Sequence, residues 1–182
     1  MIDWERNKRL LIEGSEHAIR AFLAQLPNGE LAAIGYTFEL WNESPQFNLC
    51  ANTRRYFQES ILRYRREWPE TSEQQIRWSS GDFEFPAGLL KVRNELGTEW
   101  CAENVRLHKL SDADEMGRES AYSQEVYDGL VRISCEALAV LAKKNVFGDF
   151  SKIDFNVAEY GDKIDVIKER DRMIRALIQK MA

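Results

Sequence analysis

The chain has 182 residues, of which 44% are hydrophobic and 30% are charged, which is the normal range for one globular domain. Its net charge of −5 and its isoelectric point near 5.3 disfavour a general affinity for nucleic acid or for anionic membranes. Three scattered cysteines without metal-ligand spacing argue against a disulfide framework and against a metal site. We therefore expect neither a metal nor another cofactor.

The N-terminal part of the sequence predicts an amphipathic helix over residues 2–26, in which Leu11, Ala18 and Phe22 share one face. The apolar run at residues 10–12 is too short for a signal peptide, and no apolar segment reaches membrane-spanning length. We therefore expect a cytoplasmic protein with reduced thiols and no membrane contact.

Residues 31–53 predict an antiparallel β-hairpin. Ile34, Tyr36 and Phe38 alternate with small or polar residues, and the alternation resumes after a polar, proline-bearing break at residues 42–45. Because one face of this hairpin is apolar along its length, it needs a layer of helices to cover it. The rest of the chain is expected to pack around it.

Residues 54–68 predict an amphipathic helix that is basic although the chain is acidic. The arginines that stand mostly outside its apolar face are Arg54, Arg55, Arg63, Arg65 and Arg66. Two interpretations are open. Arg63 and Arg66 are candidates for contact with phosphate or RNA, or the arginines form a solvated face that pairs with acidic neighbours. The acidic composition favours the second interpretation.

The aromatic-rich segment 75–86 predicts a third strand followed by a turn. Ile76 and Trp78 alternate as in a strand, and residues 80–82 have the composition of a turn. Trp78 and Asp82 are the candidate binding residues of this segment. Asp82 could act in binding or acid–base chemistry, or it could accept hydrogen bonds from backbone amides of the turn.

The last third of the sequence predicts two helices and a fourth strand. Residues 122–144 are apolar over two faces, which is typical of a central helix, and Cys135 is expected to fill the core there. Residues 153–158 alternate as a strand, and residues 163–181 form an amphipathic closing helix. The chain thus predicts a single α+β domain over residues 1–182, with a mainly antiparallel sheet of about four or more strands covered by helices.

Four short motifs carry a resemblance to a known family: AIGYTF at residues 33–38, CANT at 50–53, IRWSSGDF at 76–83 and NVFG at 145–148. In these motifs and in the order of its elements, nearly the whole chain resembles the domain-of-unknown-function family 4303 of bacterial proteins. Its closing helix lacks the Asn-Pro ending of that family. The resemblance implies a single α+β domain and, for some members, a place in toxin–immunity neighbourhoods. It implies no catalytic residue.

The motifs of common enzymes are absent from the sequence. It contains no glycine-rich phosphate loop, no Cys-x-x-Cys or His-x-x-x-His pair and no Gly-x-Ser-x-Gly elbow. Cys50, on the polar side of the second strand, is the most plausible nucleophile. A thiolate nucleophile also needs a lowered pKa and an orienting group, so a partly covered, unreactive thiol is the alternative.

We therefore expect a non-enzymatic, protein-binding module, which could be immunity-like and neutralise a basic toxin through an acidic face. One alternative is a small cytosolic enzyme that uses Cys50 or Asp82. Another is a weak nucleic-acid binder that uses the helix at residues 54–66. A third is a homo-oligomer held by exposed Trp4 or Trp41.

Overall fold

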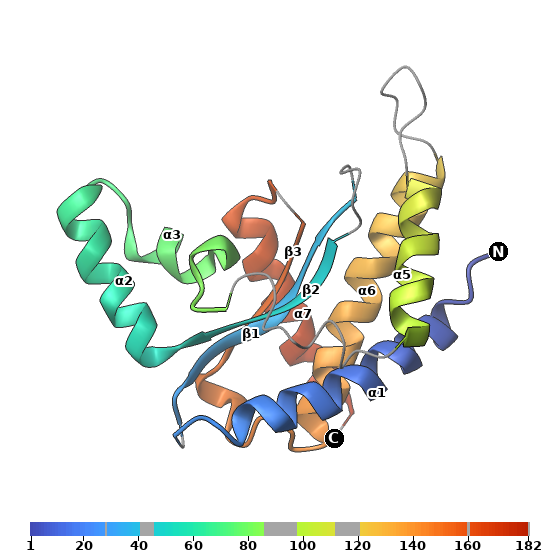
Figure 1. Cartoon of the computed structure of the whole chain (residues 1–182), viewed down its shortest axis with the longest axis horizontal. Coiled ribbons are helices and arrows are strands. Elements are labelled where there is room, and N and C mark those ends of the chain that lie inside the picture. The colour runs from blue at the N-terminus through green and yellow to red at the C-terminus, as the bar shows by residue number, and fades with distance from the viewer. Residues whose placement is uncertain (28, 41–45, 86–97, 112–120, 160, 182) are drawn as a thin grey trace.

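A computed structural model of the protein describes residues 1–27, 29–40, 46–85, 98–111, 121–159 and 161–181. The helices are α1 (Trp4–Leu23), α2 (Arg54–Glu67), α3 (Glu73–Trp78), α5 (Thr98–Ser111), α6 (Ala121–Lys143) and α7 (Ile164–Lys180), with the short 3-10 turns η1 (Ser80–Asp82) and η2 (Phe150–Lys152). The strands are β1 (Leu31–Glu39), β2 (Gln46–Thr53) and β3 (Asp154–Glu159). Figure 1 shows a small twisted sheet beside a layer of long helices, with α2 extending away from both.

The described residues form one sheet of three strands in the order β2-β1-β3. β1 pairs with β2 in antiparallel fashion and with β3 in parallel. A parallel neighbour requires a crossover connection, and the chain supplies it by passing through α6 before it enters β3. β1 is therefore the central strand and is hydrogen-bonded on both sides.

The α+β class is confirmed, but the expected sheet of four or more mainly antiparallel strands is wrong, because the sheet is mixed and has three strands within the described residues. The segment expected to be the third strand is helix α3. At its start, Ser72 Oγ accepts a hydrogen bond from the Gln75 amide at 3.2 Å, and Gln75 Oε1 accepts one from the Ser72 amide at 2.7 Å. This reciprocal capping box satisfies amides that a helix start leaves unpaired, so it favours a helix over a strand.

The alternation expected for the hairpin is confirmed in β1 and β2. Phe38 pairs with Phe47 and Tyr36 pairs with Leu49, and all four side chains are buried on the face that meets the helices. The Tyr36 hydroxyl donates a hydrogen bond to Ser15 Oγ of α1 at 2.7 Å, which fixes this helix against the sheet. The break expected at residues 42–45 lies outside the described residues.

α6 is the central helix of the layer that covers this face. It packs against α1, α5 and α7 and contacts β1 and β3. Its apolar positions are buried on more than one side: Val126, Leu130, Ile133, Ala137, Leu138 and Leu141. Cys135 is buried among them, as expected for a residue that fills the core.

The opposite face of the sheet carries a thinner layer, built from α3, η1 and residues 83–85. Two small buried clusters form there: Ala33, Cys50 and Phe83, and Trp78, Ala158 and Ile167. A single antiparallel bridge between Ala51 and Phe85 holds the chain against β2 after η1. Helix α2 makes few contacts with this layer and with the sheet.

A buried carboxylate joins α5 to α1. Glu103 accepts a hydrogen bond from Asn7 Nδ2 at 3.1 Å, and it accepts two from the Arg106 guanidinium at 3.0 and 2.5 Å. The hydrogen bonds from Arg106, aided by the one from Asn7, lower the pKa of Glu103, although burial opposes them.

Replacing Glu103 by glutamine is expected to reduce stability at neutral pH and not in acid. The pKa of Glu103 is lower in the folded chain, so its stabilisation is present above its ordinary value of 4.5 and is lost as the pH falls through the folded value. At neutral pH we expect Glu103→Gln to lower the free energy of unfolding by about 1–3 kcal/mol. Urea unfolding across the acid range tests this. A difference from wild type that stays constant with pH would contradict it.

Candidate functional site

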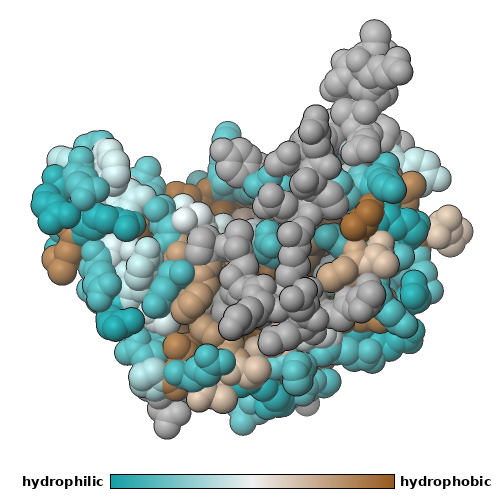
Figure 2. Space-filling model, viewed as in Figure 1, coloured by the Kyte–Doolittle hydropathy of each residue, from teal (hydrophilic) through white to brown (hydrophobic). Residues whose placement is uncertain are grey.

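Among the long helices of the described chain, α2 buries the fewest residues. Of its 14 residues, Ser60 and Ile61 alone are buried. The helix begins at Thr53, whose Oγ1 accepts a hydrogen bond from the Tyr56 amide at 3.2 Å. Figure 1 shows α2 extending outward from the end of β2, and Figure 2 shows that hydrophilic residues predominate over it, at the left of the view.

The charge of α2 is opposite to that of the whole chain. The helix contains five arginines and two glutamates, whereas the chain has a net charge of −5. Arg55, Glu59, Leu62 and Arg66 follow one another at spacings of four, three and four residues, so they share one face of the helix. We call this face the outer stripe of α2. It points away from the buried Ser60 and Ile61.

Arg63 and Asp82, two of the candidate binding residues, are brought together by Tyr64. The Tyr64 hydroxyl donates a hydrogen bond to Asp82 Oδ1, and the Arg63 guanidinium lies 5.4 Å from the centre of the Tyr64 ring. The hydrogen bond to Asp82 raises the pKa of Tyr64, because it favours the protonated phenol. A hydrogen bond with Tyr56 raises the pKa of Arg63. This arrangement joins η1 to α2 and engages the Asp82 carboxylate.

The other two candidate binding residues lie apart from this cluster. Arg66 is on the outer stripe, where its guanidinium lies 3.0 Å from the Glu67 carboxylate and remains 77% exposed. Trp78, the last residue of α3, is buried against Ala158 and Ile167, so its surroundings are those of a core side chain. The four candidates therefore do not form one site.

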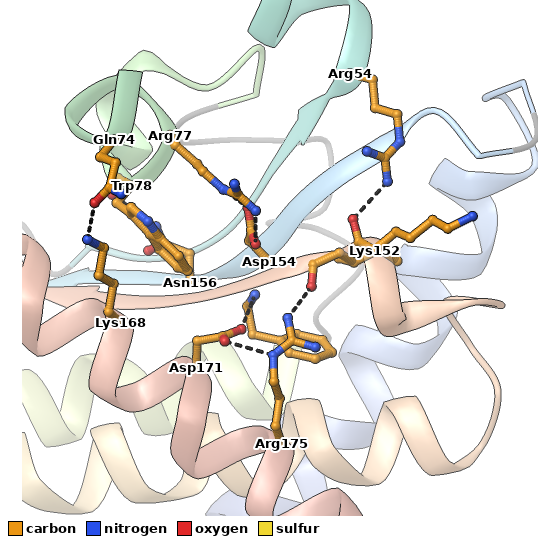
Figure 3. A network of polar contacts seen from close by, with 12 residues as sticks. Arg54, Gln74, Arg77, Trp78, Lys152, Asp154, Asn156, Lys168, Asp171 and Arg175 are labelled. Atoms are coloured by element: carbon orange, nitrogen blue, oxygen red, sulfur yellow. Dashed lines mark hydrogen bonds and ion pairs between the residues drawn. The ribbon is translucent and has the colours of Figure 1, made fainter. Parts of the chain in front are cut away.

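A polar network fixes α3 and β3, as Figure 3 shows. Arg77 donates two hydrogen bonds to the Asp154 carboxylate, from Nε at 2.6 Å and from Nη2 at 2.8 Å. Asn156 Nδ2 donates to the carbonyl oxygen of Trp78 at 3.1 Å. Lys168 of α7 donates to Gln74 of α3. These contacts hold the second layer on the sheet, and Trp78 is the one residue among them that had been a candidate from the sequence.

A hollow of about 530 Å³ lies where the end of α1, the start of β1 and the turn after α6 meet. A second hollow of about 190 Å³ lies beside β3. Arg54 and Lys152 line both hollows. Arg54 donates hydrogen bonds to the carbonyl oxygens of Gly29 at 2.8 Å and Lys152 at 2.7 Å, and so bridges the two walls. Figure 3 shows the contact with Lys152.

Cys50 lacks the exposure and the acidity that a nucleophile needs. It is fully buried against Ala33 and Phe83, and burial raises its pKa to about 12. A thiol with this pKa is protonated at neutral pH, and no substrate atom can reach it without displacing the layer that covers this face of the sheet. The catalytic interpretation of Cys50 therefore has no geometric support.

Thiol labelling tests the state of the cysteines directly. In the folded protein at pH 8 we expect iodoacetamide to modify the half-buried Cys101, while Cys50 and Cys135 react only after denaturation, because both are buried with pKa values raised to about 12. Peptide mass spectrometry with and without denaturant measures the three rates. Rapid modification of Cys50 in the folded protein would restore the enzyme hypothesis.

The residues named for self-association give no further site. Trp4 is partly buried against α6, beneath the guanidinium of Arg132 at 5.9 Å, and Trp41 lies outside the described residues. Within the described part of the chain, no group of three His, Cys, Asp or Glu side chains could hold a metal ion. Nor is any described helix long and apolar enough to cross a membrane.

Comparison of the chain with family models, with curated proteins and with solved structures finds no match. The resemblance to the domain-of-unknown-function family 4303 therefore gains no support from these comparisons. Any functional conclusion has to come from the geometry.

Proposed function

We propose that this protein is a non-enzymatic binding module that recognises an acidic protein surface through the outer stripe of α2. The observation that carries the proposal is a charged helix that extends from the fold and buries only Ser60 and Ile61. Exposed, long, charged side chains on such a helix contribute little to the stability of the fold, so they are available to bind a partner.

The composition of the outer stripe favours a protein partner. Leu62 lies at the centre of the stripe and is 66% exposed, with Arg55 before it and Arg66 after it. Protein interfaces have a buried apolar core and a polar rim, and arginine is enriched in them. Trp68, just after the helix, adds an exposed aromatic side chain.

The sign of the charge determines which partner fits. The lack of an enzyme motif, the acidic composition and the family resemblance favour a basic toxin that meets an acidic face. Helix α2 instead has an excess of arginine, and opposite charges across an interface accelerate association and select the partner. An immunity-like role remains part of the proposal, with a toxin that presents an acidic surface to α2.

The proposal is tested by recovering partners from the native host with three versions of the tagged protein. These are the wild type, the double variant Arg55→Glu/Arg66→Glu, and a control in which the exposed α7 residues are changed as Arg172→Glu/Lys180→Glu. We expect an acidic protein to be retained by the wild type and by the control, released by salt, and lost from the α2 variant. Retention of the same proteins by all three versions would exclude α2 as the binding surface.

Nucleic acid is the second candidate partner, because the arginines of α2 could contact phosphates. It predicts low-salt binding of a fluorescent oligonucleotide that weakens in Arg63→Glu/Arg66→Glu. We expect no such binding. Arg63 is already engaged by Tyr56 and Tyr64, and the net charge of −5 repels a polyanion. Nuclease-sensitive retention in the recovery experiment would reverse this preference.

A further inference from the structure

The hollow of about 530 Å³ has the size and lining of a small-molecule site. Its floor is apolar and belongs to the rigid core, because Leu31, Val146 and Ile153 are all buried. Gly29 and Gly148 stand in its wall with positive φ angles of 79° and 68°, and neither position has an atom within 4 Å of where a side chain would begin. Each glycine therefore leaves space in the wall that a side chain would otherwise fill.

Arg54 provides a fixed positive charge in this hollow. Its guanidinium is held by two backbone carbonyl oxygens, those of Gly29 and Lys152, and it forms no ion pair with a described carboxylate. In this it differs from Arg77, whose charge is balanced by Asp154. Two of the five N–H groups of a guanidinium are occupied in Arg54, so three remain to donate to a ligand.

Lys152 provides a second, adjustable positive charge beside the first. Its side chain is 74% exposed, and its ammonium group lies 3.9 Å from the Asp149 carboxylate, at the limit of an ion pair. Asp149 is also engaged by Ser151, which donates to Asp149 Oδ1 from its hydroxyl at 2.6 Å and from its amide at 3.2 Å. Lys152 can therefore turn toward an anion held by Arg54 at little cost.

We propose that this hollow binds a small organic anion, with its apolar body on the floor and its charged group between Arg54 and Lys152. The apolar floor accounts for the body, and the planar fork of a guanidinium matches the two oxygens of a carboxylate or phosphate. Arg54 belongs to α2, and its backbone carbonyl contacts reach the loop before β1 and η2. The site therefore lies at the base of α2, separate from the outer stripe.

Titration of the ¹⁵N-labelled protein with 4-phenylbutyrate tests the proposal by NMR. We expect saturable shifts of the Gly29 and Gly148 amides and of the Arg54 Nε–H resonance. The neutral analogue 4-phenylbutyramide should bind about tenfold more weakly or worse, since it lacks the charge. Butyrate, which lacks the ring, should also bind more weakly. A parallel titration with 3-phenylpropyl phosphate decides between a carboxylate and a phosphate as the preferred anion.

Variants separate the two cations from general electrostatics. Lys152→Gln should weaken 4-phenylbutyrate binding about three- to tenfold, and Lys180→Gln, an exposed lysine on α7, should leave it unchanged. Arg54→Gln should abolish binding, but it also removes two structural hydrogen bonds, so Lys152→Gln is the decisive variant. The proposal is overturned if no shift saturates at millimolar concentrations, if the amide binds as well as the acid, or if both lysine variants behave alike.

Discussion

Replacing Gly35 by alanine is expected to destabilise the protein by more than about 3 kcal/mol. This is one of the largest effects that we expect from the addition of one methyl group to this structure. A Cβ atom at this position would lie 1.5 Å from the carbonyl oxygen of Asn156 and 2.4 Å from its carbonyl carbon. These are backbone atoms of β3, so no rotation of a side chain can relieve the overlap. β1 is paired on both sides at this point, with Cys50 and with Asn156, so it cannot shift either.

Urea unfolding of Gly35→Ala measures this cost, with Gly81→Ala as the matched control. The nearest atom to a Cβ at Gly81 is Ser79 Oγ at 3.9 Å, so we expect the control to change the free energy of unfolding by less than about 1 kcal/mol. If Gly35→Ala folds with the stability of the wild type, the close parallel pairing of β1 with β3 is wrong.

The second large effect is expected at Arg170, whose side chain is 6% exposed. Its Nη1 donates to Asp162 Oδ2 at 2.5 Å and to the carbonyl oxygen of Val157 at 2.8 Å, and its Nη2 donates to the Tyr127 hydroxyl at 2.5 Å. This one side chain therefore ties α7 to β3 and to α6. Arg170→Met would leave a largely buried carboxylate without its counter-charge, which costs about 3–5 kcal/mol.

Two comparisons isolate this effect in urea unfolding at pH 7. Arg172→Met removes an arginine of the same helix that is 70% exposed, and we expect a change of less than about 1 kcal/mol. The double change Asp162→Asn/Arg170→Met should recover part of the loss, because it also removes the unpaired carboxylate. Equal stabilities for the Arg170 and Arg172 variants would contradict the burial of this ion pair.

The elements that follow from periodicity were predictable from sequence. The apolar faces of β1 and β2 and the burial of α6 depend on local spacing, which the sequence displays directly. The segment at residues 75–78 was misassigned as a strand, although the Ser72 and Gln75 pair that caps α3 was visible three residues apart. Its alternation of Ile76 and Trp78 fits a strand equally well over so short a run. The parallel pairing of β3 leaves no local signal, because both kinds of pairing have the same period.

The candidate sites were less predictable, because each depends on contacts between distant parts of the chain. Arg54 meets Lys152 across 98 positions, and no motif has such a spacing. Arg63 and Asp82 were chosen for their residue type, but only the fold shows that Tyr64 joins them. Cys50 was considered as a nucleophile because its strand position is polar, and the second layer that buries it was not foreseen.

Hydrogen–deuterium exchange of the protein, free and in complex with its recovered partner, tests whether α2 is the binding surface. If the partner binds through α2, the amides of residues 54–67 should exchange several-fold more slowly in the complex, while those of α7 keep their rates. Protection that spares α2 and appears on α7 or α1 would show that binding takes place on another surface.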